Sequence, residues 1–186
     1  MMRSKEIFIV SLFLFLLSIV FSFPAILSLP IQVIGDGGDN LQFLSFQYVG
    51  NMLFSQGNFP FEETNFWRYP VGISFQSSYD STLLILLGLI FYSFTQNGVL
   101  VYNLSLFVIF FLNAILSYLT FRRFFPSLIS LIGTIIYGFS FYSLARLLGH
   151  PIFCFLQLSP SFSFLSLTFQ KKKQKEALSF LYCLLF

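Results

Sequence analysis

The chain has 186 residues, of which 56% are hydrophobic and only 9% are charged, and its mean hydropathy is +0.83. Soluble domains carry about a quarter of charged residues, so this chain cannot cover a surface that faces water. The composition therefore excludes an ordinary soluble domain and predicts an integral membrane protein. The net charge of +3 does not indicate a nucleic-acid partner, because the basic residues gather where membrane topology would place them.

Several apolar runs are long enough to form membrane-spanning helices. A bilayer core of about 30 Å needs roughly 20 apolar residues in a helix. In chain order, the predicted spans cover residues 7–29, 99–121, 127–142 and 152–169, and a truncated span covers 177–186. The first run lacks a small-residue cleavage site, so we expect a retained anchor and not a signal peptide. Residues 1–186 are therefore expected to form a single membrane domain, an all-α polytopic transmembrane helix bundle.

The apolar run at residues 81–95 is compatible with two topologies. As a helix its 15 residues rise only about 22 Å, which is short of a full span. If the run spans the membrane, the basic residues fall on opposite sides. If it lies in the outer interface or re-enters there, eight of the ten basic residues lie on the cytoplasmic side: Arg3, Lys5, Arg122, Arg123, Lys171, Lys172, Lys173 and Lys175.

The positive-inside rule favours the second topology. We therefore expect a multi-pass protein of the cytoplasmic membrane with a cytoplasmic N-terminus. The first loop, residues 30–80, is then extracytoplasmic and is followed by an interfacial or re-entrant helix at 81–95. At about 50 residues this loop is too long to be only a connector. It holds five of the seven acidic residues, Asp36, Asp39, Glu62, Glu63 and Asp80, so function is expected there.

The glycine-rich stretch "GDGGDN" at residues 35–40 opens this loop, and it has two readings. In the first, the glycines supply the positive φ of a tight turn, and Asp39 caps a helix that begins near Asn40, with Gln42 as its capping-box partner. In the second, Asp36 and Asp39 are catalytic carboxylates. The helix that follows should be an amphipathic, interfacial helix on the outer face of the membrane, with an apolar stripe of Leu41, Leu44, Tyr48 and Met52, widened by Val49 and Leu53.

Three polar residues lie inside the second predicted span. Asn103, Asn113 and Ser117 are separated by ten and four residues, which approximate whole helical turns. Polar groups inside a membrane are expected to face other helices and not lipid. The spacing therefore predicts that this face of the helix packs against the rest of the protein.

Five short motifs occur in a recognisable order along the chain. They are "GDGGDN" at 35–40, "GNFPF" at 57–61, "FWRYPVG" at 66–72, "YLTFRRFF" at 118–125 and "LARLLGH" at 144–150. With their predicted places relative to the membrane, they resemble the N-terminal third of the polytopic glycosyltransferases of the GT-C superfamily. Bacterial relatives of protein O-mannosyltransferases and aminoarabinose transferases belong to that superfamily.

The resemblance implies transfer of a sugar from a polyprenyl-phosphate donor to an extracytoplasmic acceptor. Asp39 matches the family's catalytic acid best, and Asp36 is the second choice. Arg146 and His150 would contact the donor phosphate, although a histidine before proline is also an ordinary helix-end residue. Arg68 also has two interpretations: it contacts the donor phosphate, or it is an interfacial arginine in an aromatic belt.

The expected partners are a lipid-linked sugar donor and membrane lipids. No cofactor is predicted with certainty, no metal ligands are identified, and a divalent cation is compatible with the resemblance. GT-C transferases are usually longer, so three alternatives stay open: an active transferase, a truncated inactive fragment, or a chain that needs a missing C-terminal half or a partner subunit. The alternative function is a noncatalytic membrane subunit or carrier whose acidic external loop binds a partner or a cation.

Overall fold

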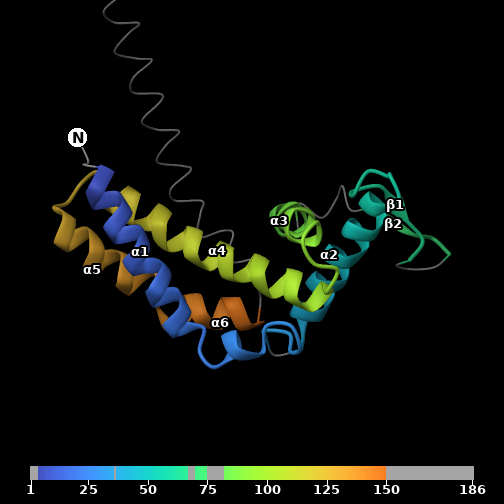
Figure 1. The fold of residues 1–186 in the computed structure, drawn as a ribbon, viewed down its shortest axis with the longest axis horizontal. Helices are drawn as coiled ribbons and strands as arrows, with labels where there is room; N and C mark the ends of the chain where they lie inside the picture. The colour runs from blue at the N-terminus through green and yellow to red at the C-terminus, as the bar shows by residue number, and fades with distance from the viewer. Residues whose placement is uncertain (1–3, 36, 67–69, 75–81, 150–186) are drawn as a thin grey trace, which may run out of the picture.

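The computed structural model describes residues 4–35, 37–66, 70–74 and 82–149, and most of them are helical (Figure 1). The elements are α1 (Ser4–Phe21), the 3-10 helix η1 (Ala25–Ser28), α2 (Asp39–Ser55), β1 (Glu63–Thr64), β2 (Ile73–Ser74), α3 (Thr82–Tyr92), α4 (Gly98–Phe121), α5 (Ser127–Gly138) and α6 (Phe141–Gly149). The two short strands pair antiparallel. The predicted helical class is therefore confirmed. The predicted spans at 152–169 and 177–186 lie outside the described residues.

Three segments of the described chain are long and apolar enough to cross a membrane. They are Ser4–Phe21, Gly98–Phe121 and Ser127–Ala145. The helix α3 has 11 residues, which rise only about 16 Å, so it is too short to cross. The lengths and composition of these helices therefore indicate a membrane protein.

The first helix ends earlier than the sequence predicts. It stops at Phe21, whereas the apolar run continues to Leu29. Pro24 supplies the physical reason, because proline has no N–H to donate and its ring clashes with the preceding turn of a helix. After this proline the chain forms the short helix η1 and turns across the end of the bundle.

The helix α4 is the centre of the fold, because it contacts α1, α2, α3 and α5. Its bounds differ by one residue from the predicted span. Large side chains along it are fully buried, among them Tyr102, Leu106, Ile109 and Phe110. The three polar residues predicted to face the protein, Asn103, Asn113 and Ser117, are also buried, which confirms that prediction.

A charged cluster joins the start of α1 to the end of α4. The Nε of Arg122 lies 2.6 Å from the Oε1 of Glu6, and the hydroxyl of Tyr118 donates to the same carboxylate at 2.9 Å. The hydroxyls of Tyr118 and Ser127 are 3.0 Å apart, which brings in the start of α5. The hydrogen bond that Arg122 donates to Glu6 raises the pKa of the Arg122 guanidinium. We call this the Arg122 end of the bundle.

The opposite end of the bundle, where α1 ends and α4 begins, carries the glycine-rich turn before α2. We call it the turn end. Figure 1 shows α1, α4 and α5 side by side, with α2 leading away from them toward the two strands. Because α1 and α4 run in opposite directions, the Arg122 end and the turn end lie at opposite ends of the three long apolar segments.

The third apolar segment is interrupted, which corrects the predicted continuous helix at 127–142. α5 ends at Gly138, and α6 begins at Phe141. Glycine has a low helix propensity, and Ser140 offers the backbone another partner: its Oγ accepts from the N–H of Ser143 at 3.2 Å. This break separates α6 from α5 at the turn end of the bundle.

The helices α2 and α3 pack closely through glycines. The Gln47 side chain reaches from α2 to donate to the backbone oxygen of Leu84 at 2.7 Å and to the Ser105 hydroxyl at 2.9 Å. A Cβ added at Gly88 would lie 2.6 Å from the Gln47 side chain. The absence of a side chain at Gly88 therefore lets Gln47 join α2, α3 and α4.

We expect Gly88→Ala to destabilise the protein by about 1–3 kcal/mol, because Gln47 must move and lose its buried hydrogen bonds. Gly133→Ala is the matched control, since it is also a helix-interior glycine but its added Cβ would lie 3.5 Å from the Phe121 ring, an ordinary contact. Thermal unfolding in detergent measures both. Equal midpoints for the two variants would contradict the close packing of α2 on α3.

The proposed topology can be tested with single cysteines in a background where Cys154 and Cys183 are replaced by serine. Asn58 follows α2, Phe124 follows α4, and both are exposed. A maleimide that cannot cross the membrane should label Asn58→Cys in intact spheroplasts and should leave Phe124→Cys unlabelled. Inverted vesicles should give the opposite pattern. Labelling of Phe124→Cys from outside would reverse the orientation.

Candidate functional site

The structure places two of the predicted site residues on helices at the turn end of the bundle. Asp39 is the first residue of α2, and Arg146 belongs to α6. Asp36, Arg68 and His150 lie outside the described residues. The helices α2 and α6 are in contact, so the elements that carry Asp39 and Arg146 are neighbours.

The capping role predicted for Asp39 is wrong in its details. The helix begins at Asp39 itself, and Gly38, which has no side chain, occupies the N-cap position. Asp39 is half-buried in the first turn, where a carboxylate interacts favourably with the positive end of the helix dipole.

The turn before Asp39 depends on glycine at two positions. Gly35 has a φ of +136° and Gly37 has a φ of +85°, backbone angles that residues other than glycine rarely adopt. Gly35 also lies directly against the Asn40 side chain, where an added Cβ would overlap the amide group. The chain therefore folds back tightly over Asn40 just before α2 begins.

Amide side chains hold both ends of this turn. The Oδ1 of Asn103 accepts from the N–H of Ile34 at 3.0 Å, and its Nδ2 donates to the backbone oxygens of Leu29 and Gln32, each at 2.7 Å. One side chain of α4 therefore fixes the whole segment that leads from η1 to the turn.

On the other side of the turn, Asn40 makes the corresponding contacts. Its Nδ2 donates to the backbone oxygen of Ile34 at 3.1 Å and to the hydroxyl of Tyr102 at 3.3 Å. Asn40, Tyr102 and Asn103 are all fully buried. Sequence reasoning assigned Asn103 to a packing face but missed Asn40, which is directly next to an acidic residue and reads as part of a polar surface.

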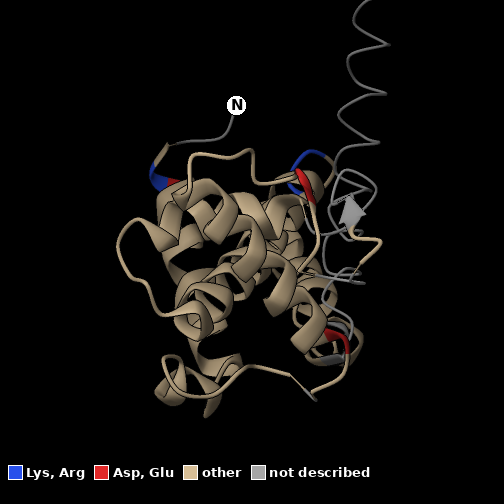
Figure 2. Ribbon diagram, turned by 90° about the vertical axis from the view of Figure 1, so that its right-hand side faces the viewer, with Lys and Arg blue, Asp and Glu red and all other residues tan. Residues whose placement is uncertain are grey.

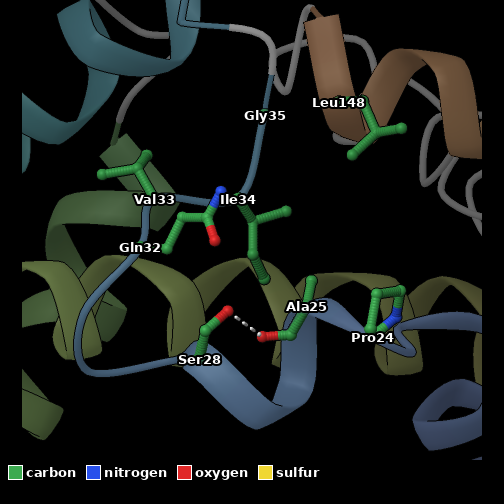
Figure 3. A pocket seen from close by; sticks show the side chains of 8 residues that line it. All are labelled: Pro24, Ala25, Ser28, Gln32, Val33, Ile34, Gly35 and Leu148. Atoms are coloured by element: carbon green, nitrogen blue, oxygen red, sulfur yellow. Dashed lines mark hydrogen bonds between the residues drawn. The ribbon is translucent and has the colours of Figure 1, made fainter.

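A cavity of about 350 Å³ lies beside the turn (Figure 3). It is lined by Pro24, Ala25, Ser28, Gln32, Val33, Ile34, Gly35 and Leu148. Figure 3 shows Leu148 of α6 on one side of the cavity and the irregular segment that carries Gln32 and Gly35 on the other. The start of the glycine-rich turn and the end of α6 therefore meet at one cavity.

The polar groups of this cavity are few. The hydroxyl of Ser28 donates to the backbone oxygen of Ala25 at 3.2 Å, and the amide of Gln32 is the other polar side chain in the lining. Most of the ribbon in Figure 2 is uncharged, and its charged residues lie away from the middle of the bundle. None of the eight lining residues carries a charge.

The acidic residues of the described chain are distributed among separate places. Glu6 lies at the Arg122 end, whereas Glu62 and Glu63 are exposed after α2. Within the described residues, no group of three or more His, Cys, Asp or Glu side chains could hold a metal ion. The geometry of this part of the chain thus offers a single carboxylate, Asp39, at the start of α2.

Comparison of the chain with protein-family models, with curated proteins and with solved structures gives no match.

The tight fold of the turn predicts that alanine at Gly35 destabilises the protein by roughly 1–3 kcal/mol more than alanine at Gly57. Both glycines have a positive φ, so both substitutions carry backbone strain. Only Gly35 also meets the Asn40 side chain, because a Cβ at Gly57 would meet open space. Thermal unfolding of the two variants in the same detergent separates the two effects. Equal losses would mean that Gly35 does not lie against Asn40.

Proposed function

We propose that this chain is a glycosyltransferase-like membrane protein that transfers a sugar from a polyprenyl-phosphate donor to a hydroxyl acceptor outside the membrane. The observation that carries the proposal is the meeting of the glycine-rich acidic turn with α6 at one cavity. The resemblance to GT-C transferases assigns the catalytic acid to this turn and the donor-phosphate contacts to α6 and the residues after it. Contact between these elements is what such a reaction requires.

The reaction follows from the chemistry of a carboxylate close to a leaving phosphate. Asp39 accepts the proton of the acceptor hydroxyl while the hydroxyl oxygen bonds to the anomeric carbon of the sugar. The bond from that carbon to the donor phosphate breaks, and the polyprenyl phosphate leaves with the bonding electrons. Arg146 and His150 are proposed to bind the phosphate, with Arg68 as a further cationic contact. Asp36 is proposed to assist Asp39.

The dimensions of the cavity support a substrate of limited size. Ligand pockets in proteins have volumes of about 300–1,000 Å³, and the volume of about 350 Å³ beside Gly35 lies in the lower part of that range. A single sugar ring fits this range, whereas the isoprenoid chain of the donor would remain in the lipid. The proposal places this cavity near the outer surface of the cytoplasmic membrane.

A noncatalytic subunit or carrier is the second candidate, and the cavity lining favours it. Six of the eight lining residues have no polar side-chain group; Ser28 and Gln32 are the exceptions. Such a lining suits an apolar group of a lipid or of a partner protein. In that role the acidic turn would bind a partner or a cation without transferring a sugar.

Substitution of the candidate base separates the two functions. We expect Asp39→Asn to lower the rate of sugar transfer by about 10²–10⁴-fold, because an amide cannot accept the proton of the acceptor. Glu62→Gln is the matched control, since it removes an exposed carboxylate of the same predicted loop. The assay follows a radiolabelled sugar from polyprenyl phosphate to the acceptor fraction in proteoliposomes.

Membrane insertion of each variant is checked by the cysteine labelling described for the fold. Equal transfer by Asp39→Asn and the wild-type protein would remove Asp39 from the role of general base. Absence of transfer by the correctly inserted wild-type chain, also after addition of a downstream half or partner subunit, would favour the carrier.

A further inference from the structure

We propose that Asn40, Tyr102 and Asn103 are positioning residues, which hold the two ends of the glycine-rich turn, Ile34 and Asn40, on α4 and thereby orient the Asp39 carboxylate. This inference rests on the proposed function of Asp39. It adds three uncharged residues to the machinery of the site, none of which would touch the substrate.

Two neighbouring residues of α4 bind the two ends of the same turn. Asn103 accepts from the N–H of Ile34, the last residue before the turn, at 3.0 Å. Tyr102 accepts from the side chain of Asn40, the first residue after the turn, at 3.3 Å. The turn is therefore held on α4 at both of its ends by consecutive residues.

A third contact closes the turn on itself. The Nδ2 of Asn40 also donates to the backbone oxygen of Ile34 at 3.1 Å, so the residues that flank the turn are bonded to each other. Gly35 packs directly against the Asn40 amide, where no Cβ would fit. Asp39 precedes Asn40 in the chain, so its backbone is fixed on the C-terminal side by a residue that is fully buried.

Burial makes these contacts difficult to exchange for others. Asn40, Tyr102 and Asn103 each have 0% of their surface exposed. A buried donor or acceptor that loses its partner carries the full cost of desolvation, because water cannot replace the partner. If the turn moved away from α4, several buried backbone and side-chain groups would lose their hydrogen-bond partners. This cost keeps the turn in one position.

Orientation of this kind contributes directly to a transfer reaction. A displacement of about 1 Å at a reacting group can lower the rate by about 10²-fold, although substrate binding elsewhere is unchanged. A residue that positions Asp39 should therefore affect kcat and leave KM nearly constant. A residue that only stabilises the fold would lower the amount of active protein without changing the rate of each remaining active molecule.

The test uses Tyr102→Phe, which removes one hydroxyl and keeps the buried ring. Tyr48→Phe is the matched control, because Tyr48 is half-exposed on α2 and away from the turn. In the proteoliposome transfer assay, normalised to the folded protein, we expect Tyr102→Phe to lower kcat by about 10–100-fold with KM within about twofold of the wild-type value. We expect Tyr48→Phe to leave both constants unchanged.

A second measurement reports the position of the turn independently of activity. A nitroxide label is attached at Asp39→Cys in the protein without its two native cysteines, and electron paramagnetic resonance measures the mobility of the label. We expect the label to be more mobile with Tyr102→Phe or Asn103→Ala than with Tyr48→Phe. Amide hydrogen exchange at Ile34 should be about tenfold faster or more in Asn103→Ala, since its acceptor is removed.

Faster motion of the label together with a lower kcat supports the proposal. An unchanged label, or a mobile label with an unchanged kcat, overturns it. Failure of the proposed function gives a different result, namely equal transfer by Asp39→Asn and the wild-type protein, and it leaves the mobility measurement unaffected. The two claims can therefore fail separately.

Discussion

The side chain of Asn103 makes three hydrogen bonds to the backbone between η1 and the glycine-rich turn, and much of the turn end depends on them. In an apolar protein the backbone of an irregular segment has few places to find partners, because neither lipid nor aliphatic side chains can supply them. An amide both donates and accepts, so one residue satisfies groups of both kinds. The position of Asn103 on α4 therefore determines where the segment between η1 and the turn, the wall of the cavity and the start of α2 lie.

The sequence was sufficient to predict the features that depend on composition and spacing. The helical class follows from the long apolar runs, and burial of Asn103, Asn113 and Ser117 follows from their common helix face. The prediction works because a polar group within an apolar span has one favourable direction, toward the protein. For the candidate site, the resemblance predicted that the glycine-rich turn and residues 144–150 act together, but neither the cavity beside Gly35 nor the buried contacts of Asn40 could be predicted, because they depend on contacts distant along the chain.

The features that could not be predicted are those in which tertiary contacts override a local pattern. Of the apolar stripe predicted on α2, Val49 and Leu53 are buried and Leu41 and Tyr48 are exposed, while the polar residues Asn40, Gln47 and Asn51 are buried as well. Amphipathic reasoning assigns polar residues to the outside, but Asn40 donates to Tyr102 of α4, and Gln47 donates to Leu84 of α3 and Ser105 of α4. Pro24 could have indicated the end of α1 from the sequence, since proline is unfavourable inside a helix. The break between α5 and α6 depends instead on the hydrogen bonds of Ser140.

Neutral amides have a physical advantage over charges in fixing an acidic turn. A cation placed where Asn103 lies would be costly to bury, and it would also attract Asp39 and weaken it in the proposed role of general base. An acid there would repel Asp39. Amide and hydroxyl groups hold the backbone through short-range hydrogen bonds and add no net charge. In the described part of the chain, the buried hydrogen bonds near the turn join uncharged groups, and the Arg122–Glu6 pair lies at the other end of α4. In the proposed reaction, the Asp39 carboxylate would then respond to the charges of the donor phosphate and the acceptor, because Asn40, Tyr102 and Asn103 carry no charge of their own.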